Sequence, residues 1–141
     1  MAYRVTFCLD GFTWADRARA KRRLQILLDA LTALCREWFE AHPEAPNVWA
    51  SGMRYIREPL GEEDWQEPGY SLRKGGGDCE DLACYQAGWE QAHGIPSRAV
   101  ARAKPWRLPN GGWGILFHIV VVRPDGQVLD PSKDLGMKGS A

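Results

Sequence analysis

The stretch from residue 75 to residue 92 reads GGGDCEDLACYQAGWEQA and predicts a sharp turn that leads straight into a helix. Asp78 suits the N-cap position, because its side chain can accept hydrogen bonds from the free backbone N–H groups of a first helical turn. Apolar residues then recur at helical steps on one face, namely Leu82, Tyr85 and Trp89. Residues that end helices follow in order, namely His93, Gly94 and Pro96. We therefore expect a helix over Cys79–Ala92.

Upstream of this helix, the pattern predicts one strand, one long helix and an irregular connection. Residues 3–9 are rich in β-formers and alternate loosely, which favours a strand. From residue 14 to residue 42 apolar residues recur at helical steps, Thr13 suits the N-cap, and prolines follow the last turn. Residues 47–70 mix Pro, Gly and acidic residues, which predicts an irregular, packed connection with one short helix at most.

Downstream, three short stretches predict an antiparallel sheet over residues 97–103, 114–123 and 127–131. Helices first and strands afterwards are typical of an α+β fold. A chain of 141 residues is long enough for one core. We therefore expect a single domain over residues 1–141, with N-terminal helices packed on a small antiparallel sheet. Its motifs lie in residues 64–132, and residues 1–46 supply the first strand and the long helix.

The composition argues against several classes of protein. The 18 basic and 18 acidic residues balance, so we expect neither nucleic-acid binding nor attachment to a membrane surface. No apolar run is long enough to span a membrane and the first residues lack a signal-peptide pattern, so we expect a cytoplasmic protein. The four cysteines show no spacing of a disulfide framework or a zinc site, and Cys8 and Cys35 are expected to be buried thiols.

Cys79 is the candidate nucleophile, because it follows three glycines and opens the predicted helix. The free N–H groups and the dipole of a helix N-terminus stabilise a thiolate, and glycines let a substrate approach the backbone. The backbone N–H of Cys79 is also a candidate oxyanion donor. A glycine linker and an ordinary helix start, capped by Asp78, explain the same residues. Acidic neighbours oppose ionisation of the thiol, so catalysis requires a basic partner.

His118 and Asp130 are the candidate partners of this thiol. His118 interrupts an apolar strand, where a histidine is either hydrogen-bonded in the core or functional. Asp130 ends the next strand, where an acidic residue also commonly starts a turn. A three-residue loop between these strands would pair Arg123 with Gln127 and set His118 and Asp130 on one face as diagonal neighbours, whereas a two-residue loop would separate them. The Pro-Asp-Gly turn favours the longer loop, because its glycine suits the left-handed third position.

Four stretches, in this order, resemble the transglutaminase-like superfamily. They are Gly76-Gly77-Asp78-Cys79-Glu80-Asp81-Leu82-Ala83, Gly94-Ile95-Pro96-Ser97-Arg98, Phe117-His118-Ile119-Val120-Val121 and Leu129-Asp130-Pro131-Ser132. The run Trp65-Gln66-Glu67-Pro68 ahead of the glycines is similar to the bacterial transglutaminase-like cysteine proteinases. The resemblance covers residues 64–132, and the first sixty residues carry none of it.

This resemblance implies a papain-like fold, in which the helix that carries the nucleophile packs on an antiparallel sheet. Cys79 would be the nucleophile, His118 the general base and acid, and Asp130 the group that orients the imidazole. Either Gln66 or Trp65 would complete the oxyanion hole. The chain would thus be a thiol protease with a catalytic triad.

The resemblance also bears on metal binding. It implies no required cofactor, but some of these proteinases bind calcium through the acids beside the cysteine, which here are Asp78, Glu80 and Asp81. Carboxylate oxygens suit Ca²⁺, and a bound cation would offset the repulsion of a thiolate. Helix capping and surface charge explain the same three acids.

The resulting expectation is a hydrolase that cleaves an amide bond of a protein or peptide through a cysteine thioester. Two alternatives stay open. One is amide transfer to an amine, which is transglutaminase activity. The other is a non-catalytic structural or binding module of a phage, located in the virion, which keeps the fold. The basic residues from 17 to 23 predict either a polyanion-binding face or a solvated helix surface.

Overall fold

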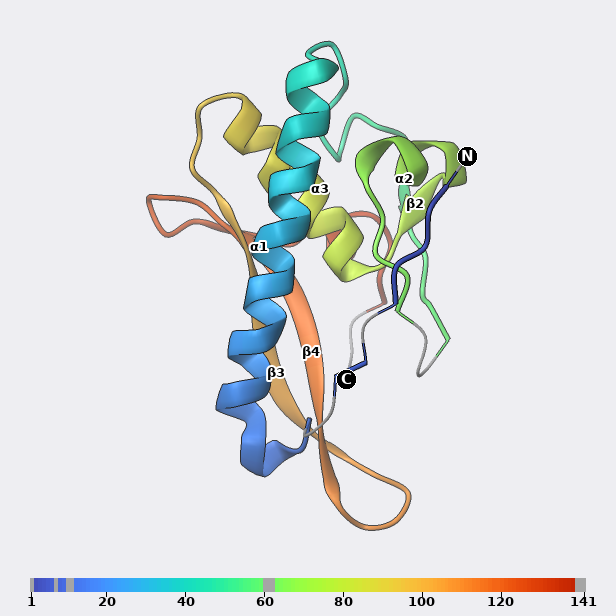
Figure 1. The fold of residues 1–141 in the computed structure, drawn as a ribbon, viewed down its shortest axis with the longest axis vertical. Helices are drawn as coiled ribbons and strands as arrows, with labels where there is room; N and C mark the ends of the chain where they lie inside the picture. Colours follow the sequence, from blue (N-terminus) through green and yellow to red (C-terminus); the bar gives the residue numbers. More distant parts are fainter. Residues whose placement is uncertain (1, 7, 10–11, 60–62, 139–141) are drawn as a thin grey trace.

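Helices on one side and a small antiparallel sheet on the other make up the protein, as the computed structural model shows for residues 2–6, 8–9, 12–59 and 63–138 (Figure 1). The helical elements are η1 (Trp14–Asp16), α1 (Arg17–Ala41), α2 (Pro68–Lys74), α3 (Cys79–Ala92) and α4 (Pro131–Asp134). The strands are β1 (Arg54–Tyr55), β2 (Gly76–Gly77), β3 (Arg98–Arg107), β4 (Trp113–Val122) and β5 (Val128–Leu129). The three-stranded sheet has the order β3-β4-β5, and β1 pairs with β2 in parallel. This arrangement agrees with the expected mixture of helices and antiparallel sheet.

The core lies where α1, α3 and the sheet meet. One apolar cluster joins Leu28 and Cys35 of α1, Leu82 of α3, and Ile119 and Val121 of β4. The two helices touch closely at Gly88, where a Cβ atom would lie 2.5 Å from Cβ of Cys35. The contact leaves no room for a larger residue at position 88, so it fixes how closely α3 packs against α1.

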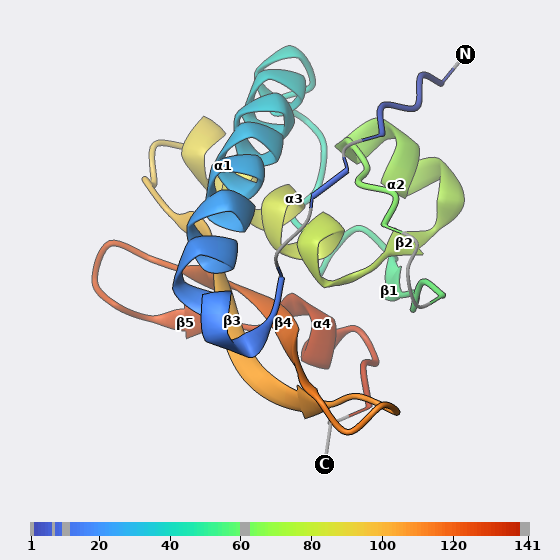
Figure 2. The ribbon, with the colours of Figure 1, turned by 60° about the horizontal axis from the view of Figure 1, so that its bottom comes forward.

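α1 also covers the free edge of the sheet. The Gln25 amide donates to the carbonyl of Ala99 at 2.8 Å and accepts from the N–H of Ala101 at 3.4 Å. A side-chain amide can replace a missing strand in this way, because it offers both a donor and an acceptor. Figure 2 shows α1 running along β3. The edge of β3 is therefore satisfied from within the chain at Ala99 and Ala101, which protects this part of it from pairing with another strand.

The β4–β5 connection has the predicted three-residue loop. Val121 pairs with Leu129, and the N–H of Arg123 donates to the carbonyl of Gln127 at 2.9 Å. Gly126 has a φ of 88°, which is the left-handed position expected for it. Continuing this register past β5 sets residue 130 opposite residue 120. The prediction about this turn is confirmed, and it positions the acid that the candidate site uses.

Three expectations from the sequence are wrong or incomplete. The described residues between 2 and 9 form no strand, although their composition favours one, and Cys8 is exposed rather than buried. Residues 47–70 contain the two-residue strand β1 and the start of α2. β1 is too short to leave a periodic pattern, and it exists because the backbone of Arg54 pairs with Gly76 from the glycine run.

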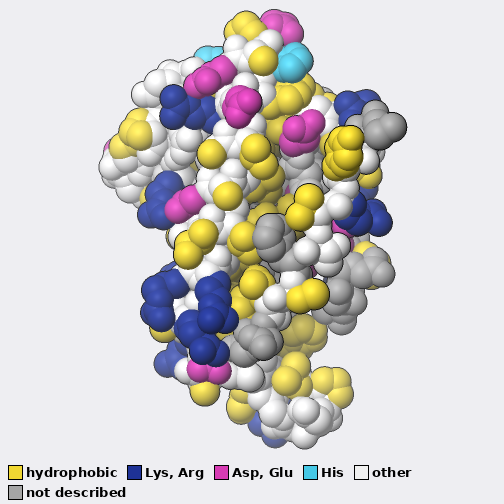
Figure 3. All heavy atoms as spheres, viewed as in Figure 1, with side chains coloured by type: hydrophobic (Ala, Val, Ile, Leu, Met, Phe, Trp, Pro, Cys, Tyr) yellow, Lys and Arg dark blue, Asp and Glu magenta, His cyan; other side chains and the backbone are white. Residues whose placement is uncertain are grey.

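The basic residues at the start of α1 lie on an exposed face (Figure 3). Arg17 stacks its guanidinium over the ring of Trp14, and Arg19 lies 3.8 Å from a carboxylate oxygen of Asp16. Exposed ion pairs of this kind contribute little to stability. Among the residues that the structure describes, no helix has the length and apolar character needed to cross a membrane.

Candidate active site around Cys79

The start of α3 is fixed by a capping box that uses Asp81. Its Oδ2 accepts the N–H of Asp78 at 3.1 Å and its Oδ1 accepts the N–H of Gln66 at 2.8 Å. Gly77 is required beside it, since a Cβ atom there would lie 2.6 Å from Cβ of Asp81. Asp78 in turn accepts the N–H of Cys79 at 2.7 Å. The box orients the first turn of the helix, and both oxygens of Asp81 are used in doing so.

The thiol of Cys79 lies at the open edge of β4. The N–H of Arg123 donates to Gln127 and so points toward β5. Because N–H groups alternate sides along a strand, those of residues 121 and 119 point to the β5 edge of β4 as well. β5 covers this edge only as far as Leu129. Beyond its end, the N–H of Ile119 lies near enough to the sulfur of Cys79 to act on the pKa of the thiol. The nucleophile predicted from sequence therefore touches the strand residue that follows His118, and it is 9% exposed.

His118 and Asp130 form the predicted pair. Nε2 of His118 lies 2.8 Å from Oδ2 of Asp130, and the two side chains are 26% and 20% exposed. Oδ1 of Asp130 also caps α4, because it accepts the N–H of Lys133 at 3.3 Å. If Nε2 carries the proton that Asp130 accepts, Nδ1 keeps a free lone pair, as a general base requires. Nδ1 has no hydrogen-bond partner in the described part of the chain.

The third contact of the triad, between thiol and imidazole, is not made in this structure. The thiol of Cys79 instead donates to Oε2 of Glu80 at 3.5 Å. Burial raises the pKa of this thiol well above its ordinary value, and the charges of Glu80 and Asp78 raise it further, while the N–H of Ile119 acts to lower it. The sequence-based concern about acidic neighbours thus holds in the folded protein.

Four carboxylates gather next to the thiol. One oxygen from each of Glu58, Glu63, Asp78 and Glu80 lies within 4.8 Å of the others. Burial raises the pKa of Glu58, Glu63 and Glu80, and nearby carboxylates add to the shift in each. Asp81 is not in this group, so the structure brings together two of the three predicted calcium ligands. Sequence reasoning missed Glu58 and Glu63, because they lie in a segment without periodicity.

Neither predicted oxyanion donor is presented to the thiol. With its amide in the orientation that satisfies all neighbours, Gln66 donates to the carbonyl of Gly76 at 3.2 Å and to the hydroxyl of Ser71 at 2.9 Å. The Trp65 indole lies near enough to Glu63 to lower the pKa of its carboxyl. The N–H of Cys79 already bonds to Asp78. Gln66 therefore braces the glycine run, which is a structural role that its buried position at 4% exposure requires.

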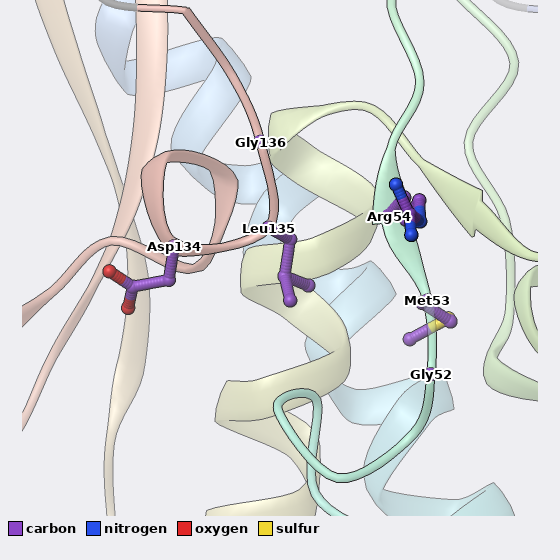
Figure 4. A pocket seen from close by; sticks show the side chains of 6 residues that line it. All are labelled: Gly52, Met53, Arg54, Asp134, Leu135 and Gly136. Carbon is purple, nitrogen blue, oxygen red and sulfur yellow. The ribbon is translucent and has the colours of Figure 1, made fainter.

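Two hollows of the surface lie away from these residues. One of about 400 Å³ lies between the end of α4 and the segment that leads into β1 (Figure 4), and its lining residues are Gly52, Met53, Arg54, Asp134, Leu135 and Gly136. Another lies between α1 and the end of α3. Neither is lined by the thiol, the imidazole or the carboxylate of the candidate triad. Comparison with family models, curated proteins and solved structures finds no match to this chain.

Proposed function

We propose that the chain is a cysteine-dependent acyl-transfer enzyme that hydrolyses an amide bond of a protein or peptide through a thioester, on a transglutaminase-like, papain-like core. One observation carries the proposal. The 2.8 Å His118–Asp130 pair is next to Ile119, whose N–H contacts the sulfur of Cys79 at the tip of a helix. The candidate base and orienting acid are thus paired, and the candidate nucleophile lies against the next residue of the same strand.

The proposed reaction starts with transfer of the thiol proton of Cys79 to Nδ1 of His118, while Asp130 holds Nε2 and stabilises the imidazolium. The thiolate attacks the carbonyl carbon, and the collapsing intermediate expels the amine, which takes the proton from His118. The acyl group is then bound to sulfur as a thioester. His118 next removes a proton from water, whose oxygen attacks the thioester carbonyl. The C–S bond breaks, the acyl group leaves as a carboxylic acid, and the thiolate regains the proton from His118.

This reaction requires the thiol to turn from Glu80 to the imidazole. We propose that this change of partner occurs by rotation about χ1 of Cys79, with the helix in place. A cation bound beside Glu80 would lower the repulsion between the thiolate and its acidic neighbours. Calcium fits the donors present, because Asp78 and Glu80 offer hard carboxylate oxygens and Oε1 of Glu80 is buried without a hydrogen-bond partner in the described residues. Asp81 does not fit, since both its oxygens bond to backbone N–H groups.

A binding module is the second candidate, and one observation favours it. The thiol lacks a bond to the imidazole, and its raised pKa leaves it protonated in the described state.

Amide transfer to an amine shares every step up to the thioester with hydrolysis. The amine would simply replace water as the attacking group.

Trapping of the acyl-enzyme tests the proposal. A Cys8→Ser variant, which lacks the exposed thiol, is mixed with p-nitrophenyl acetate and acid-quenched, and its peptides are mapped by mass. We expect a burst of nitrophenol and an acetyl group on Cys79, and neither in the Cys8→Ser, Cys79→Ala double variant. Equal, slow nitrophenol release by both proteins would favour the binding module. Addition of a primary amine then separates transfer from hydrolysis by the product formed.

A further inference from the structure

Two segments bring carboxylates to one point beside α3. Asp78 and Glu80 come from the first turn of that helix, and Glu58 and Glu63 come from the segment between β1 and α2. Their ligand atoms all lie within 4.8 Å of one another. None of the ion pairs in the described part of the chain involves these four side chains, although the charge of Lys74 acts to lower the pKa of Glu58.

Orphaned oxygens point to a ligand at this cluster. Glu80 is 4% exposed, and its Oε1 has no hydrogen-bond partner among the described residues. Oε1 of Glu58 is buried without such a partner as well. A buried carboxylate oxygen that is left unpaired destabilises a fold, and native structures explain such groups by a bound ion or water.

The remaining contacts hold the carboxylates in place. Oε2 of Glu58 accepts the N–H of Asp64 at 2.9 Å, and the indole of Trp65 lies near enough to Glu63 to lower the pKa of its carboxyl. The phenol of Tyr55 lies beside the carboxylate of Asp78, whose charge acts with burial to raise the pKa of Tyr55. Such contacts orient metal-binding carboxylates from behind and are typical of built sites rather than of solvated surface charge.

We propose that Glu58 and Glu63 complete a calcium site with Asp78 and Glu80, so that one ion joins the segment after β1 to the first turn of α3. The proposal extends the metal part of the proposed function to residues outside the cysteine motif, and it does not require the thiol to react. Oxygen-only donors with four carboxylates suit a hard cation such as Ca²⁺. The ion would lie next to Cys79, because Asp78 and Glu80 flank it.

Metal binding by the full chain tests this inference without an activity assay. Tb³⁺ substitutes for Ca²⁺, and Trp65 is placed to sensitise its luminescence, so titration with Tb³⁺ and displacement by Ca²⁺ report the site. Calorimetry with Ca²⁺ alone gives the affinity. We expect saturable binding at one site by the natural chain, and affinity at least about tenfold lower in Glu58→Gln and in Glu63→Gln.

Glu67→Gln is the matched control, because Glu67 is exposed, lies in the same segment and is outside the cluster. Its affinity should equal that of the natural chain. Circular dichroism in chelator checks that all variants fold. The inference is overturned if the natural chain binds no Ca²⁺, or if Glu58→Gln and Glu63→Gln bind it as tightly as Glu67→Gln. If Cys79 is acetylated but the chain binds no Ca²⁺, the calcium site is wrong and the proposed enzyme activity stands. If the chain binds Ca²⁺ but Cys79 is not acetylated, the calcium site stands and the proposed enzyme activity is wrong.

Discussion

Nε2 of His118 and Oδ2 of Asp130 lie 2.8 Å apart, although twelve residues separate them in the chain. The register of β4 and β5 brings them together, because Val121 pairs with Leu129 and residue 130 therefore falls diagonally across from His118. The interaction is thus a consequence of loop length. One residue fewer in the turn would turn Asp130 to the other face.

Asp130→Asn tests what this contact does for reactivity. Asparagine keeps the shape and can still cap α4, but its amide no longer favours the imidazolium or the tautomer that leaves Nδ1 free. We expect acetylation of Cys79 to slow by about 100-fold, which is within the range for loss of general-base catalysis. The melting temperature should stay the same. If Cys79 is acetylated at the same rate in Asp130→Asn as in the natural chain, the role of Asp130 is only to cap α4.

The ion pair between Arg123 and Glu90 predicts a stability effect far from the thiol. Nε of Arg123 lies 2.7 Å from Oε1 of Glu90, which is fully buried at 0% exposure. Arg123→Met leaves this charge unpaired, so we expect a loss of about 2–3 kcal/mol in the free energy of unfolding, less than for a fully buried pair because Arg123 is partly exposed. Arg98→Met breaks the exposed pair with Asp29 and should cost below about 1 kcal/mol by the same urea titration.

Glu90 also predicts how stability depends on pH. Burial alone would raise the pKa of Glu90, but hydrogen bonds from Arg123, Gln86 and Ser97 together lower it below its ordinary value. A lowered pKa in the folded state means that unfolding takes up a proton, so this stability is present above the ordinary pKa and is lost as pH falls through the lowered one. In Glu90→Gln the urea midpoint should change less over this acidic range. An identical pH slope in both proteins would contradict the assignment.

Gly88 marks a tight steric contact between α1 and α3. A Cβ atom there would lie 2.5 Å from Cβ of Cys35 and 2.9 Å from the backbone nitrogen of Arg36. Gly88→Ala should therefore push α3 away from α1 and lower the free energy of unfolding by about 1–3 kcal/mol. In Gly112→Ala, at the β3–β4 loop, the nearest atom is the end of the flexible Asn110 side chain, and stability should stay within about 0.5 kcal/mol. Equal midpoints for the two variants would refute the close contact.

The sequence predicts the fold best where local signals agree. α3 spans Cys79–Ala92 as expected, because a capping acid and a glycine–proline stop mark its two ends. The β4–β5 register follows from turn chemistry in the same way. The expected strand near the N-terminus is wrong because β-propensity alone does not provide a partner strand.

The candidate site is predictable only in part. Cys79, His118 and Asp130 stand out by residue type and position, but the sequence offers no sign that Glu58 and Glu63 approach Glu80. Glu58 and Glu63 come near Glu80 because β1 pairs in parallel with the glycine run. Each of these strands has two residues, and the paired residues are more than twenty positions apart in the chain. Gln66 stands out in the sequence by its place near the motif, and in the structure this polar residue is buried and bonds to the glycine run.

Alkylation of Cys79 tests the central claim most directly, because it asks whether His118 activates this one sulfur. Iodoacetamide is applied at neutral pH in the presence of Ca²⁺, and peptide mapping compares Cys79 with Cys8, the exposed reference thiol of the same chain. We predict faster labelling of Cys79 than of Cys8, and at least about 100-fold slower labelling of Cys79 in His118→Ala with Cys8 unaffected. Labelling of Cys79 that is slower than that of Cys8 and unchanged by His118→Ala would contradict the claim.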